Sequence, residues 1–500
     1  MPATASSIAA PGTVPYAEPH FPQLATVVAL LYLAQVARGI ASRLFYAGLL
    51  GEIAVGVIFG PVGKILEESW METFLLVGYI GLVLIVFEGG LTMQPSSFVP
   101  QLPLACVTAL VGVLAPIALT FGLYHGYGYP TIDAFAAGSA LASTSLGTTF
   151  FVLRAAGPEL GVSKVGEILK GAALIDDVIA LVLLATIEPL ASDGGDTSDL
   201  GWTVGRPIVA SLAMAVVTPV AAIWIFGPVF RWRRLSDWVA RGGHNAELFL
   251  GVAVLSAFLA IADYAGTTML LGAFLAGYFL SALPAPGSAV SFVACWDAYL
   301  LPIHEHILVP LFFISIGFSI PFLQLWTGKR IWRGIVYAIL MTIGKLLAGL
   351  PVLIVGLIKD RHASGGLFVR SSKPEDGGAA LDSKSPPPIP SNTFAEKATS
   401  DNFEPRGVTR GSLFRNETLP AAAFVGMALV ARGEIGVLVL QVARSASADS
   451  TSPVLGEEAY LTGLWAVALC TIAGPIAFGF LVKRYGETIK RGPWGILANA

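Results

Sequence analysis

The sequence predicts an all-α membrane protein that crosses the bilayer about thirteen times. Of its 500 residues, 55% are hydrophobic and only 13% are charged, and the mean hydropathy is +0.73. Soluble domains carry about 25% charged residues. Apolar runs of about 20 residues, long enough to cross about 30 Å of hydrocarbon, recur from Leu24 to Leu481. Polar interruptions inside two runs predict that two of the helices are broken within the membrane.

Each predicted span is an apolar run between polar breaks. The spans centre on residues 24–42, 49–63, 71–92, 101–123, 131–153, 165–188, 204–229, 246–262, 267–283, 306–324, 332–357, 418–442 and 458–482. Residues 1–358 thus hold the first eleven spans, 417–485 hold the last two, and 486–500 form a short cytoplasmic tail. Residues 359–416 are rich in Ser, Pro and Gly without apolar periodicity, which predicts a disordered cytoplasmic insert. The insert is a tolerated linker or a regulatory segment.

Basic residues in the short loops predict the orientation, because Lys and Arg accumulate on the cytoplasmic side. With the N-terminus outside or in a lumen and the C-terminus in the cytoplasm, most basic loops fall inside and the acidic turns fall outside. One loop, with Lys329, Arg330 and Arg333, disagrees. The plasma membrane and an endomembrane both fit these features.

The composition also indicates which partners, metals and cofactors are not expected. The net charge is −3 and no basic-aromatic module occurs, so we expect no nucleic-acid binding. Cys106, Cys295 and Cys470 lie in or beside apolar segments without a CxxC motif, and we interpret them as packing residues. His304 and His306 are two positions apart and do not share a helix face, so we expect no metal site there. We expect no cofactor.

Two adjacent aspartates lie in the middle of the sixth predicted span. Ionisable side chains cost about 2.5 to 3.5 kcal/mol each at the centre of a bilayer, so Asp176 and Asp177 need a function or a partner. Adjacent helical residues point about 100° apart, so the two carboxylates face different neighbours rather than share one proton. One can hold a structural partner while the other faces a water-filled cavity. Alternatively, both belong to ion pairs between helices.

Lys345 is a lone cation in the middle of the eleventh predicted span. A charged ammonium group is costly there, and an ion pair with Asp176 or Asp177 would remove much of that cost. A lysine side chain that extends to the membrane interface is the alternative.

Two predicted spans in opposite halves of the chain carry polar interruptions. The fifth contains Ser143, Thr144 and Ser145, and the twelfth contains Arg432, Gly433 and Glu434. At such a break, side-chain hydroxyls and backbone carbonyls that lack a helical hydrogen bond could coordinate a small cation. Ser and Thr also join membrane helices together through hydrogen bonds. Paired interruptions are typical of inverted-repeat transporters, whose broken helices cross at the midplane.

Glu88 in the third span is a further candidate for transport. It could instead pair with Arg432 or lie near the membrane interface. The acidic residues at membrane depth outnumber the basic ones, so the site should attract a cation. These residues are Glu88, Asp176, Asp177 and Glu434 against Lys345 and Arg432.

In combination, these motifs resemble the monovalent cation:proton antiporter superfamily, the sodium/hydrogen exchanger family in its broad sense. The matching stretches, in order, are 51–53 through Gly60-Pro61, 87–91, Ser143-Thr144-Ser145, Asp176-Asp177, 272–277, 310–313, Lys345 and Arg432-Gly433-Glu434. The resemblance implies a sodium/proton antiporter-like fold of thirteen helices with inverted repeats. It also implies a mobile six-helix core, a dimerisation domain that forms a homodimer, and an elevator-like motion.

The same resemblance implies a role for each candidate residue. Asp177 would bind either a monovalent cation or a proton, and Asp176 would pair with Lys345. Thr144 would line the broken fifth helix beside Ser145, with Ser143 as a further candidate, and Glu434 would support the broken twelfth helix beside Arg432. The double aspartate resembles the electrogenic branch, whereas Glu88 and the stretch 432–434 resemble the electroneutral branch, so the proton:cation stoichiometry stays open.

The predicted function is therefore secondary active exchange of Na+ or K+ for H+, and not an enzymatic activity. A cation channel is one alternative, but channels usually place carboxylate rings from several subunits around one pore. An intramembrane aspartyl protease is another, but its two aspartates would have to approach from separate helices to share a proton.

Overall fold

The computed structural model describes residues 18, 20–93, 98–191, 200–285, 288, 290–365, 410–432, 434–445 and 454–495. Within these residues all regular structure is helical. Nine of the described helices are long and apolar enough to cross a membrane, and shorter apolar helices occur at Leu49–Val62, Met269–Ala282, Thr418–Ala428 and Ile435–Arg444. The expectation of an all-α polytopic membrane protein is confirmed, and the count of thirteen spans stays a prediction.

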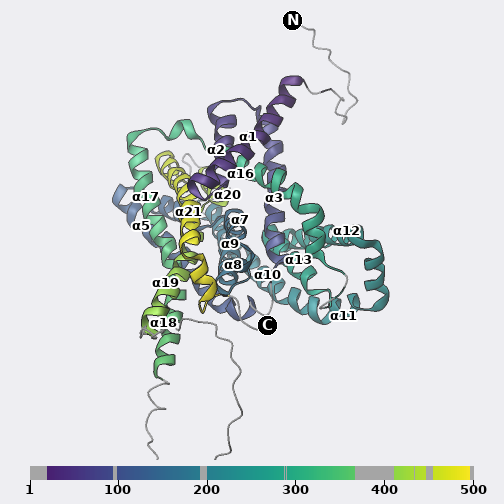
Figure 1. Ribbon diagram of the computed structural model, residues 1–500. Coiled ribbons are helices and arrows are strands. Elements are labelled where there is room, and N and C mark those ends of the chain that lie inside the picture. The colour runs from purple at the N-terminus through teal and green to yellow at the C-terminus, as the bar shows by residue number, and fades with distance from the viewer. Residues whose placement is uncertain are drawn as a thin grey trace, which may run out of the picture.

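The first group of packed helices comes from the N-terminal region and the middle of the chain. It comprises α1 (Phe21–Phe45), α2 (Leu49–Val57) with η1 (Ile58–Val62), α3 (Glu68–Leu91), α12 (Arg233–Ala265), α13 (Met269–Ala282) and a continuous run of α14 (Phe292–Cys295), η4 (Trp296–Leu300), α15 (Leu301–Ile303), η5 (His304–Leu308) and α16 (Val309–Phe318), followed by η6 (Phe322–Leu325). In Figure 1, α3, α12 and α13 lie on the right-hand side of the molecule.

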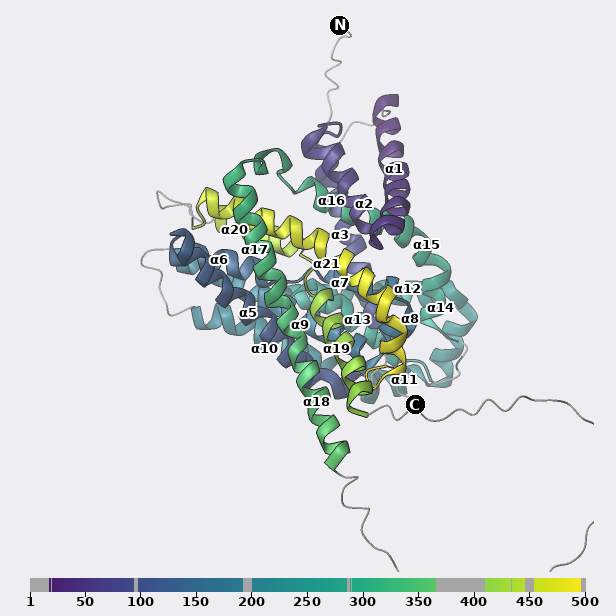
Figure 2. The same ribbon diagram turned by 60° about the vertical axis from the view of Figure 1, so that its left-hand side comes forward.

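The second group combines helices from both halves of the chain. It comprises η2 (Val99–Gln101), α5 (Leu102–Tyr127), α6 (Thr131–Ala142), α7 (Leu146–Ala155), α8 (Pro158–Gly161), α9 (Lys164–Ala191), α17 (Gly328–Leu346), η7 (Leu347–Gly349), α18 (Leu350–Gly365), α19 (Arg410–Ala428), α20 (Glu434–Ser445) and α21 (Glu457–Arg491). The view in Figure 2 shows α5, α6 and α17 on the opposite side of the molecule from α1 and α15. Between the groups, α10 (Leu200–Val220), which continues through η3 (Ala221–Phe226) into α11 (Gly227–Phe230), contacts α9 and α13.

The helix that ends at Phe318 begins much earlier than the sequence predicted. The span was expected at 306–324, as an apolar run between polar breaks. Instead, the helix runs from Phe292 to Phe318, with π-helical turns at Trp296–Leu300 and His304–Leu308. Pro302 and Pro310 stand in the first turns of α15 and α16, directly after these wider turns, where a missing backbone N–H is tolerated.

Glycines allow α3 and α13 to touch backbone to backbone. A Cβ added at Gly90 would lie 2.0 Å from the carbonyl oxygen of Phe274, and one at Gly277 would lie 2.2 Å from the carbonyl oxygen of Phe87. Small residues at helix contacts are how membrane helices gain close van der Waals packing. The first group therefore has a tightly packed centre against which the second group lies.

The second group contains two sets of three spans, and the middle span of each set is broken. Residues 143–145 separate α6 from α7, and residues 429–433 separate α19 from α20. Asp133, in the first turn of α6, accepts a hydrogen bond of 3.2 Å from the backbone N–H of Gly456, which follows the end of α20. The two broken spans therefore run in opposite directions, as the paired interruptions in the sequence predicted.

The basic loop that disagreed with the predicted orientation is neutralised by acidic residues. Arg330 pairs with Glu458 at 2.7 Å and with Glu457 at 3.5 Å. Arg333 donates to the hydroxyl of Tyr129, and its guanidinium lies 4.6 Å from the ring centroid of Tyr127. This basic loop therefore lies beside the acidic turn that contains Glu457 and Glu458.

Three predicted chain boundaries fall inside helices. The helix α18 continues to Gly365 and α19 begins at Arg410, so both helices extend into the insert predicted at 359–416. Residues 366–409, its central part, lie outside the described residues. Likewise α21 continues to Arg491, into the predicted tail.

Candidate functional site

A buried ion pair joins α9 to α17. Lys345, in the last turn of α17, donates a hydrogen bond of 2.9 Å from Nζ to Oδ2 of Asp176. Lys345 is fully buried and Asp176 is only 1% exposed. Of the two partners that the residues alone left open for Lys345, the structure pairs it with Asp176. A second hydrogen bond of 2.9 Å runs from Lys345 Nζ to Oγ1 of Thr144, so the ammonium group also contacts the break between α6 and α7.

Asp177 lines a cavity of about 510 Å³, although it is itself only 4% exposed. The cavity lies between the two groups of helices, because its walls come from α3, α12, α13 and α16 on one side and from α9 and α20 on the other. Its polar lining residues are Asp177, Asp263, Thr267, Thr268, Ser315, Ser319 and Gln441, with Tyr79 beside them. The two adjacent aspartates therefore have different surroundings, as the helical geometry predicted: one holds a lysine and the other faces a cavity.

The two broken spans contact each other at their interruptions. Arg432 donates from Nη1 to the carbonyl oxygen of Ser143 at 2.6 Å and to that of Leu429 at 3.4 Å. These carbonyls directly follow the ends of α6 and α19, where helix dipoles place partial negative charge. The fully buried guanidinium of Arg432 thus stabilises two helix C-termini at once.

Hydroxyl and backbone groups complete this crossing. Thr144 donates from Oγ1 to the carbonyl oxygen of Leu429, and Thr149 donates to that of Ala428, each at 3.4 Å. The backbone N–H of Ser145 donates to the carbonyl oxygen of Ala431 at 3.2 Å. Most of the polar groups freed by one break are therefore satisfied by the other, as membrane burial requires.

Serines at the first break have local roles as well. The hydroxyl of Ser143 donates to the carbonyl oxygen of Ala140 at 2.7 Å. Ser145 caps α7, since its Oγ accepts a hydrogen bond of 3.3 Å from the backbone N–H of Thr148. The candidate residues Ser143, Thr144 and Ser145 thus lie together with Arg432 and Lys345.

For the predicted residue Glu434, the structure gives the backbone only. Glu434 begins α20 directly after the break, but its side chain lies outside the described part of the chain, as does Gly433. Its proposed support of the broken helix stays a prediction. From α21, the hydroxyl of Thr471 donates to the carbonyl oxygen of Arg432.

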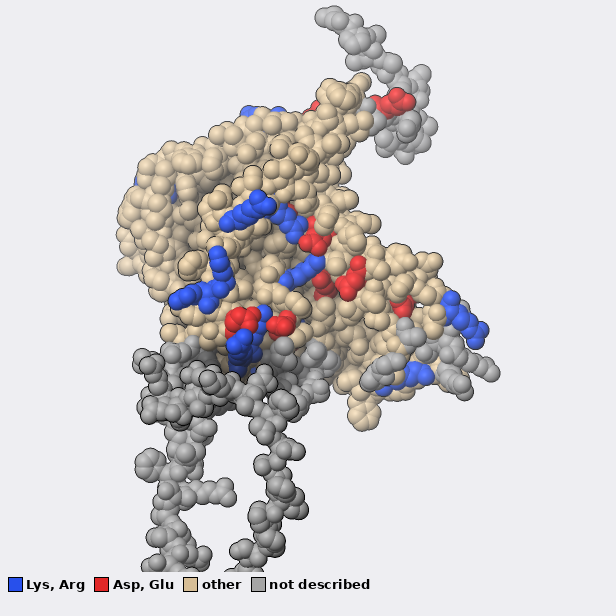
Figure 3. All heavy atoms as spheres, viewed as in Figure 1, with Lys and Arg blue, Asp and Glu red and all other residues tan. Residues whose placement is uncertain are grey.

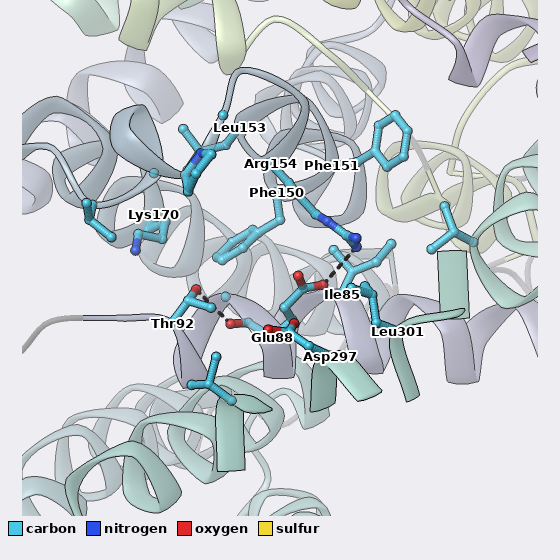
Figure 4. A pocket seen from close by; sticks show the side chains of 17 residues that line it. Ile85, Glu88, Thr92, Phe150, Phe151, Leu153, Arg154, Lys170, Asp297 and Leu301 are labelled. Atoms are coloured by element: carbon cyan, nitrogen blue, oxygen red, sulfur yellow. Dashed lines mark hydrogen bonds and ion pairs between the residues drawn. The ribbon is translucent and has the colours of Figure 1, made fainter. Parts of the chain in front are cut away.

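Glu88 does not pair with Arg432, and that part of the expectation is wrong. Its Oε2 lies 3.0 Å from Nη1 of Arg154, the last-turn arginine of α7 (Figure 4). Glu88 stands near the end of α3, and it lines a second cavity of about 450 Å³ with Arg154, Lys170 and Asp297. Figure 4 shows Glu88 and Arg154 pointing toward each other across this cavity.

Arg154 is the centre of a network that ties α7 to the first group of helices. Its Nη2 also pairs with Glu305 at 3.2 Å, and Glu305 pairs with Arg38 of α1 at 3.3 Å. Arg38 in turn lies 3.7 Å from Glu52, a fully buried residue of α2. In Figure 3, most of the charged side chains on this face gather in a band across its middle, with a broad uncharged surface above them.

The two cavities lie toward opposite ends of α3. Leu75, Tyr79 and Leu82 line the Asp177 cavity, whereas Ile85, Glu88 and Gly89 line the second one. No described residue lines both. Leu82 and Phe312 stand between them against α7, since a Cβ added at Gly147 would lie 2.5 Å from the Phe312 ring and 2.8 Å from Leu82 Cδ1.

Several polar residues of these cavities had no signal in the sequence. Asp263 and Gln441 stand near helix ends, where polar residues are ordinary. In the sequence, Arg154 is an ordinary basic residue between the fifth and sixth predicted spans, and its partner Glu305 stands between His304 and His306. The imidazole of His304 is fully buried, and its Nε2 lies 3.2 Å from the carbonyl oxygen of Gly81.

Three bacterial ion-transport proteins share sequence with 59% to 66% of this chain. The high-affinity Na+/H+ antiporter NhaS3 of Synechocystis is 25% identical over 336 residues, which cover 59% of this chain and 67% of NhaS3. The probable Na+/H+ antiporter GerT of Bacillus cereus is 26% identical over 340 residues, which cover 66% of this chain and 82% of GerT. The glutathione-regulated potassium-efflux protein KefC of Klebsiella pneumoniae is 29% identical over 309 residues, covering 59% of this chain but only 45% of KefC.

A solved structure and a family model agree with these relatives. The electron-microscopy structure of the sodium proton antiporter MjNhaP1 from Methanocaldococcus jannaschii matches 93% of this chain and 96% of its own, with a TM-score of 0.51 at 16% identity. The two proteins share a fold. The family model described as "Sodium/hydrogen exchanger, transmembrane" matches residues 26–373, which is more than half of the chain. The chain therefore belongs to the sodium/hydrogen exchanger family of transmembrane proteins.

Proposed function

We propose that this chain exchanges Na+ or K+ for H+ by alternating access, and that Asp177 binds either the cation or the proton. The observation that carries this proposal is the different surroundings of the two aspartates. Asp176 is paired with Lys345 at 2.9 Å, whereas Asp177 lines a cavity of about 510 Å³. As a member of a transporter family, the chain is not an enzyme.

Competition at one carboxylate couples the two ions. Asp177 can hold a proton or a cation, but a single carboxylate does not hold both at once. A core that carries neither would move an uncompensated negative charge through the membrane, which costs several kcal/mol. The loaded forms therefore cross and the empty form does not, and this difference makes the protein an exchanger rather than a leak.

The crossing of the broken spans supplies the rest of the proposed site. Arg432 binds the carbonyl oxygens of Ser143 and Leu429, and Lys345 binds the hydroxyl of Thr144. These two cations therefore hold the break in place. Lys345 also neutralises Asp176, and Asp177 is the carboxylate of the pair that lines the cavity. Thr144 and Ser145 are candidate ligands through oxygens at the same break, and Ser143 is a further one.

The separate cavities favour exchange over the channel alternative. A channel needs one continuous pore, whereas here the Asp177 cavity and the Glu88 cavity share no described lining residue. Leu82 and Phe312, packed on Gly147, form the barrier between them. The arrangement is the one that alternating access requires, with the ion site open toward one side at a time.

We further propose how the parts of the chain work together. The second group of helices is the mobile core, and the first group is the scaffold, which forms a homodimer. The N-terminus lies outside or in a lumen, and the insert predicted at 359–416 and the C-terminus lie in the cytoplasm. Crosslinking of the intact protein in membranes tests the dimer, and protease protection of tags at both termini tests the orientation.

The proposed exchange is tested with the purified full chain in proteoliposomes that hold a pH-sensitive dye and an acidic interior. Adding Na+ or K+ outside should drive protons out, with saturation in the cation concentration. Titrations of both cations, with and without a clamped membrane potential, give the selectivity and the stoichiometry. Cation flux without proton counterflow would support the channel and contradict the exchange.

A further inference from the structure

Three residues with metal-binding side chains meet far from the proposed transport site. His244 and Glu247 belong to α12, and Cys295 ends α14. The possible ligand atoms of these three residues all lie within 4.8 Å of one another. None of the three lines the cavity that contains Asp177.

A break in α12 brings the first two residues into place. Gly243 has φ 57° and ψ −151°, which interrupts the helix directly before His244. That backbone conformation favours glycine, because a Cβ is strained at positive φ. His244 therefore begins a new helical run, and residues three apart on it share one face. The imidazole Nδ1 lies 2.8 Å from Oε2 of Glu247.

Hydrogen bonds between backbone and side-chain groups hold the start of α14 against this face of α12. The backbone N–H of Ser291 donates to Oε1 of Glu247 at 3.0 Å, and the hydroxyl of Ser291 caps α14. The thiol of Cys295 donates to the carbonyl oxygen of His244 at 3.4 Å. The start of α14 is thus fixed on the broken part of α12, although Glu247 and Cys295 are far apart in sequence.

We infer that His244, Glu247 and Cys295 form a binding site for Zn2+ or a similar transition metal. Imidazole nitrogen, thiolate sulfur and carboxylate oxygen are the ligands that Zn2+ takes in proteins. Glu247 and Cys295 are 4% and 3% exposed, whereas the His244 side chain is 46% exposed, so one side of the site is open to water as a fourth ligand.

The geometry needs only a small closure. Ligands around a tetrahedral Zn2+ lie about 3.4 to 3.8 Å apart, given metal–ligand bonds of about 2.0 to 2.3 Å. The possible ligand atoms here lie within 4.8 Å of one another, so side-chain shifts of up to about 1 Å would bring them to this spacing. On binding, the thiol proton leaves to solvent and the sulfur bonds the metal.

This site selects against the transported ions. Na+ and K+ prefer oxygen ligands, whereas a thiolate and an imidazole select softer metals. A bound metal would join α12 to α14 inside the first group of helices. It would stabilise that group without occupying the Asp177 cavity.

Cobalt is a direct probe of the thiolate ligand. The full-length protein is purified in detergent, treated with a chelator and titrated with Co2+. We expect one equivalent of Co2+ to give intense visible bands and a near-ultraviolet sulfur-to-cobalt charge-transfer band, both removed by Zn2+. The charge-transfer band should be lost in Cys295→Ser and retained in Cys106→Ser, which removes an exposed cysteine elsewhere.

Two further measurements separate the site from a folding defect. His244→Gln, at an exposed position, should weaken Co2+ binding at least tenfold, whereas His306→Gln should leave it unchanged. Zn2+ should raise the melting temperature of the unmodified protein and not that of His244→Gln. The inference is overturned if the unmodified protein binds no stoichiometric Co2+, or if Cys295→Ser keeps the charge-transfer band.

Discussion

Asp176 and Asp177 differ because one helix position faces a lysine and the next faces a cavity. The pair Lys345–Asp176 is buried on both sides, at 0% and 2% side-chain exposure. Removing two charges from water costs several kcal/mol per ion, and their attraction offsets this cost only when both are present. The loss of one partner alone therefore destabilises the protein more than the loss of both.

Lys345→Ala is predicted to destabilise the protein strongly. It leaves the Asp176 carboxylate buried without its cation, which typically costs about 3 to 5 kcal/mol. We expect a lower melting temperature in detergent by scanning fluorimetry.

The control for this prediction is the double variant Lys345→Ala with Asp176→Asn. It removes both charges, so it should melt at a higher temperature than Lys345→Ala alone. Equal melting of Lys345→Ala and the unmodified protein would show that the pair contributes nothing to stability.

At the scale of helices, close packing between α3 and α13 depends on two glycines. Gly277→Ala would place a methyl group 2.2 Å from the carbonyl oxygen of Phe87, a backbone atom that cannot rotate away. Overpacking of this kind costs about 1 to 3 kcal/mol, so the melting temperature should fall. In the matched control Gly39→Ala on α1, the added methyl group meets nothing within 4 Å. A fall of the same size in both variants would contradict this account of the α3–α13 contact.

The network around Arg154 ties a helix of the proposed core to the proposed scaffold. If α7 moves relative to α3, the pairs of Arg154 with Glu88 and Glu305 must separate. Partly exposed ion pairs contribute about 0.2 to 1 kcal/mol each. Loss of the network should therefore raise the population of the opposite conformation by up to about fivefold per pair.

Arg154→Gln tests this effect through a cysteine placed at Ala180, which lines the Asp177 cavity. In a background with Cys106→Ser, a membrane-impermeant maleimide is added from the side of the Glu88 cavity. Labelling should be faster with Arg154→Gln than without it. Arg43→Gln is the control, because Arg43 makes no ion pair with a described residue. Unchanged labelling would mean that the network does not hold this conformation.

The helices and the two breaks could be predicted from the sequence, whereas ion pairs between residues far apart in sequence could not. The hydropathy of each run and the polar residues at 143–145 and 432–434 are local signals, and both breaks occur where they were expected. Pairing of Glu88 with Arg432 was one of the alternatives considered, because both are charges at membrane depth. Its partner Arg154 lies 66 positions away in sequence, and only the packing of α7 on α3 brings them together.

Polar residues misled the prediction of one helix boundary. The polar stretch around His304 looked like a boundary, but η5 carries it within a continuous helix, where Glu305 meets Arg38 and Arg154. The cluster of His244, Glu247 and Cys295 was missed for a related reason. Each residue is unremarkable in its own segment, and the break at Gly243 that assembles them is a tertiary feature.

Over the whole molecule, the proposed function depends on one carboxylate between two groups of helices. The Asp177 cavity opens toward one end of α3 and the Glu88 cavity toward the other, with Leu82 and Phe312 between them. Relative movement of the groups would expose Asp177 to the second cavity. The ion that Asp177 carries at each crossing then determines the exchange.

The most direct measurement of this account is cation-driven proton efflux by Asp177→Asn in proteoliposomes. The amide keeps the size of the side chain but can neither take up a proton near neutral pH nor supply a negative charge to a cation. We predict that efflux driven by Na+ or K+ is abolished, while the variant elutes and melts like the unmodified protein. Efflux at the rate of the unmodified protein would contradict the assignment of Asp177 as the exchange site.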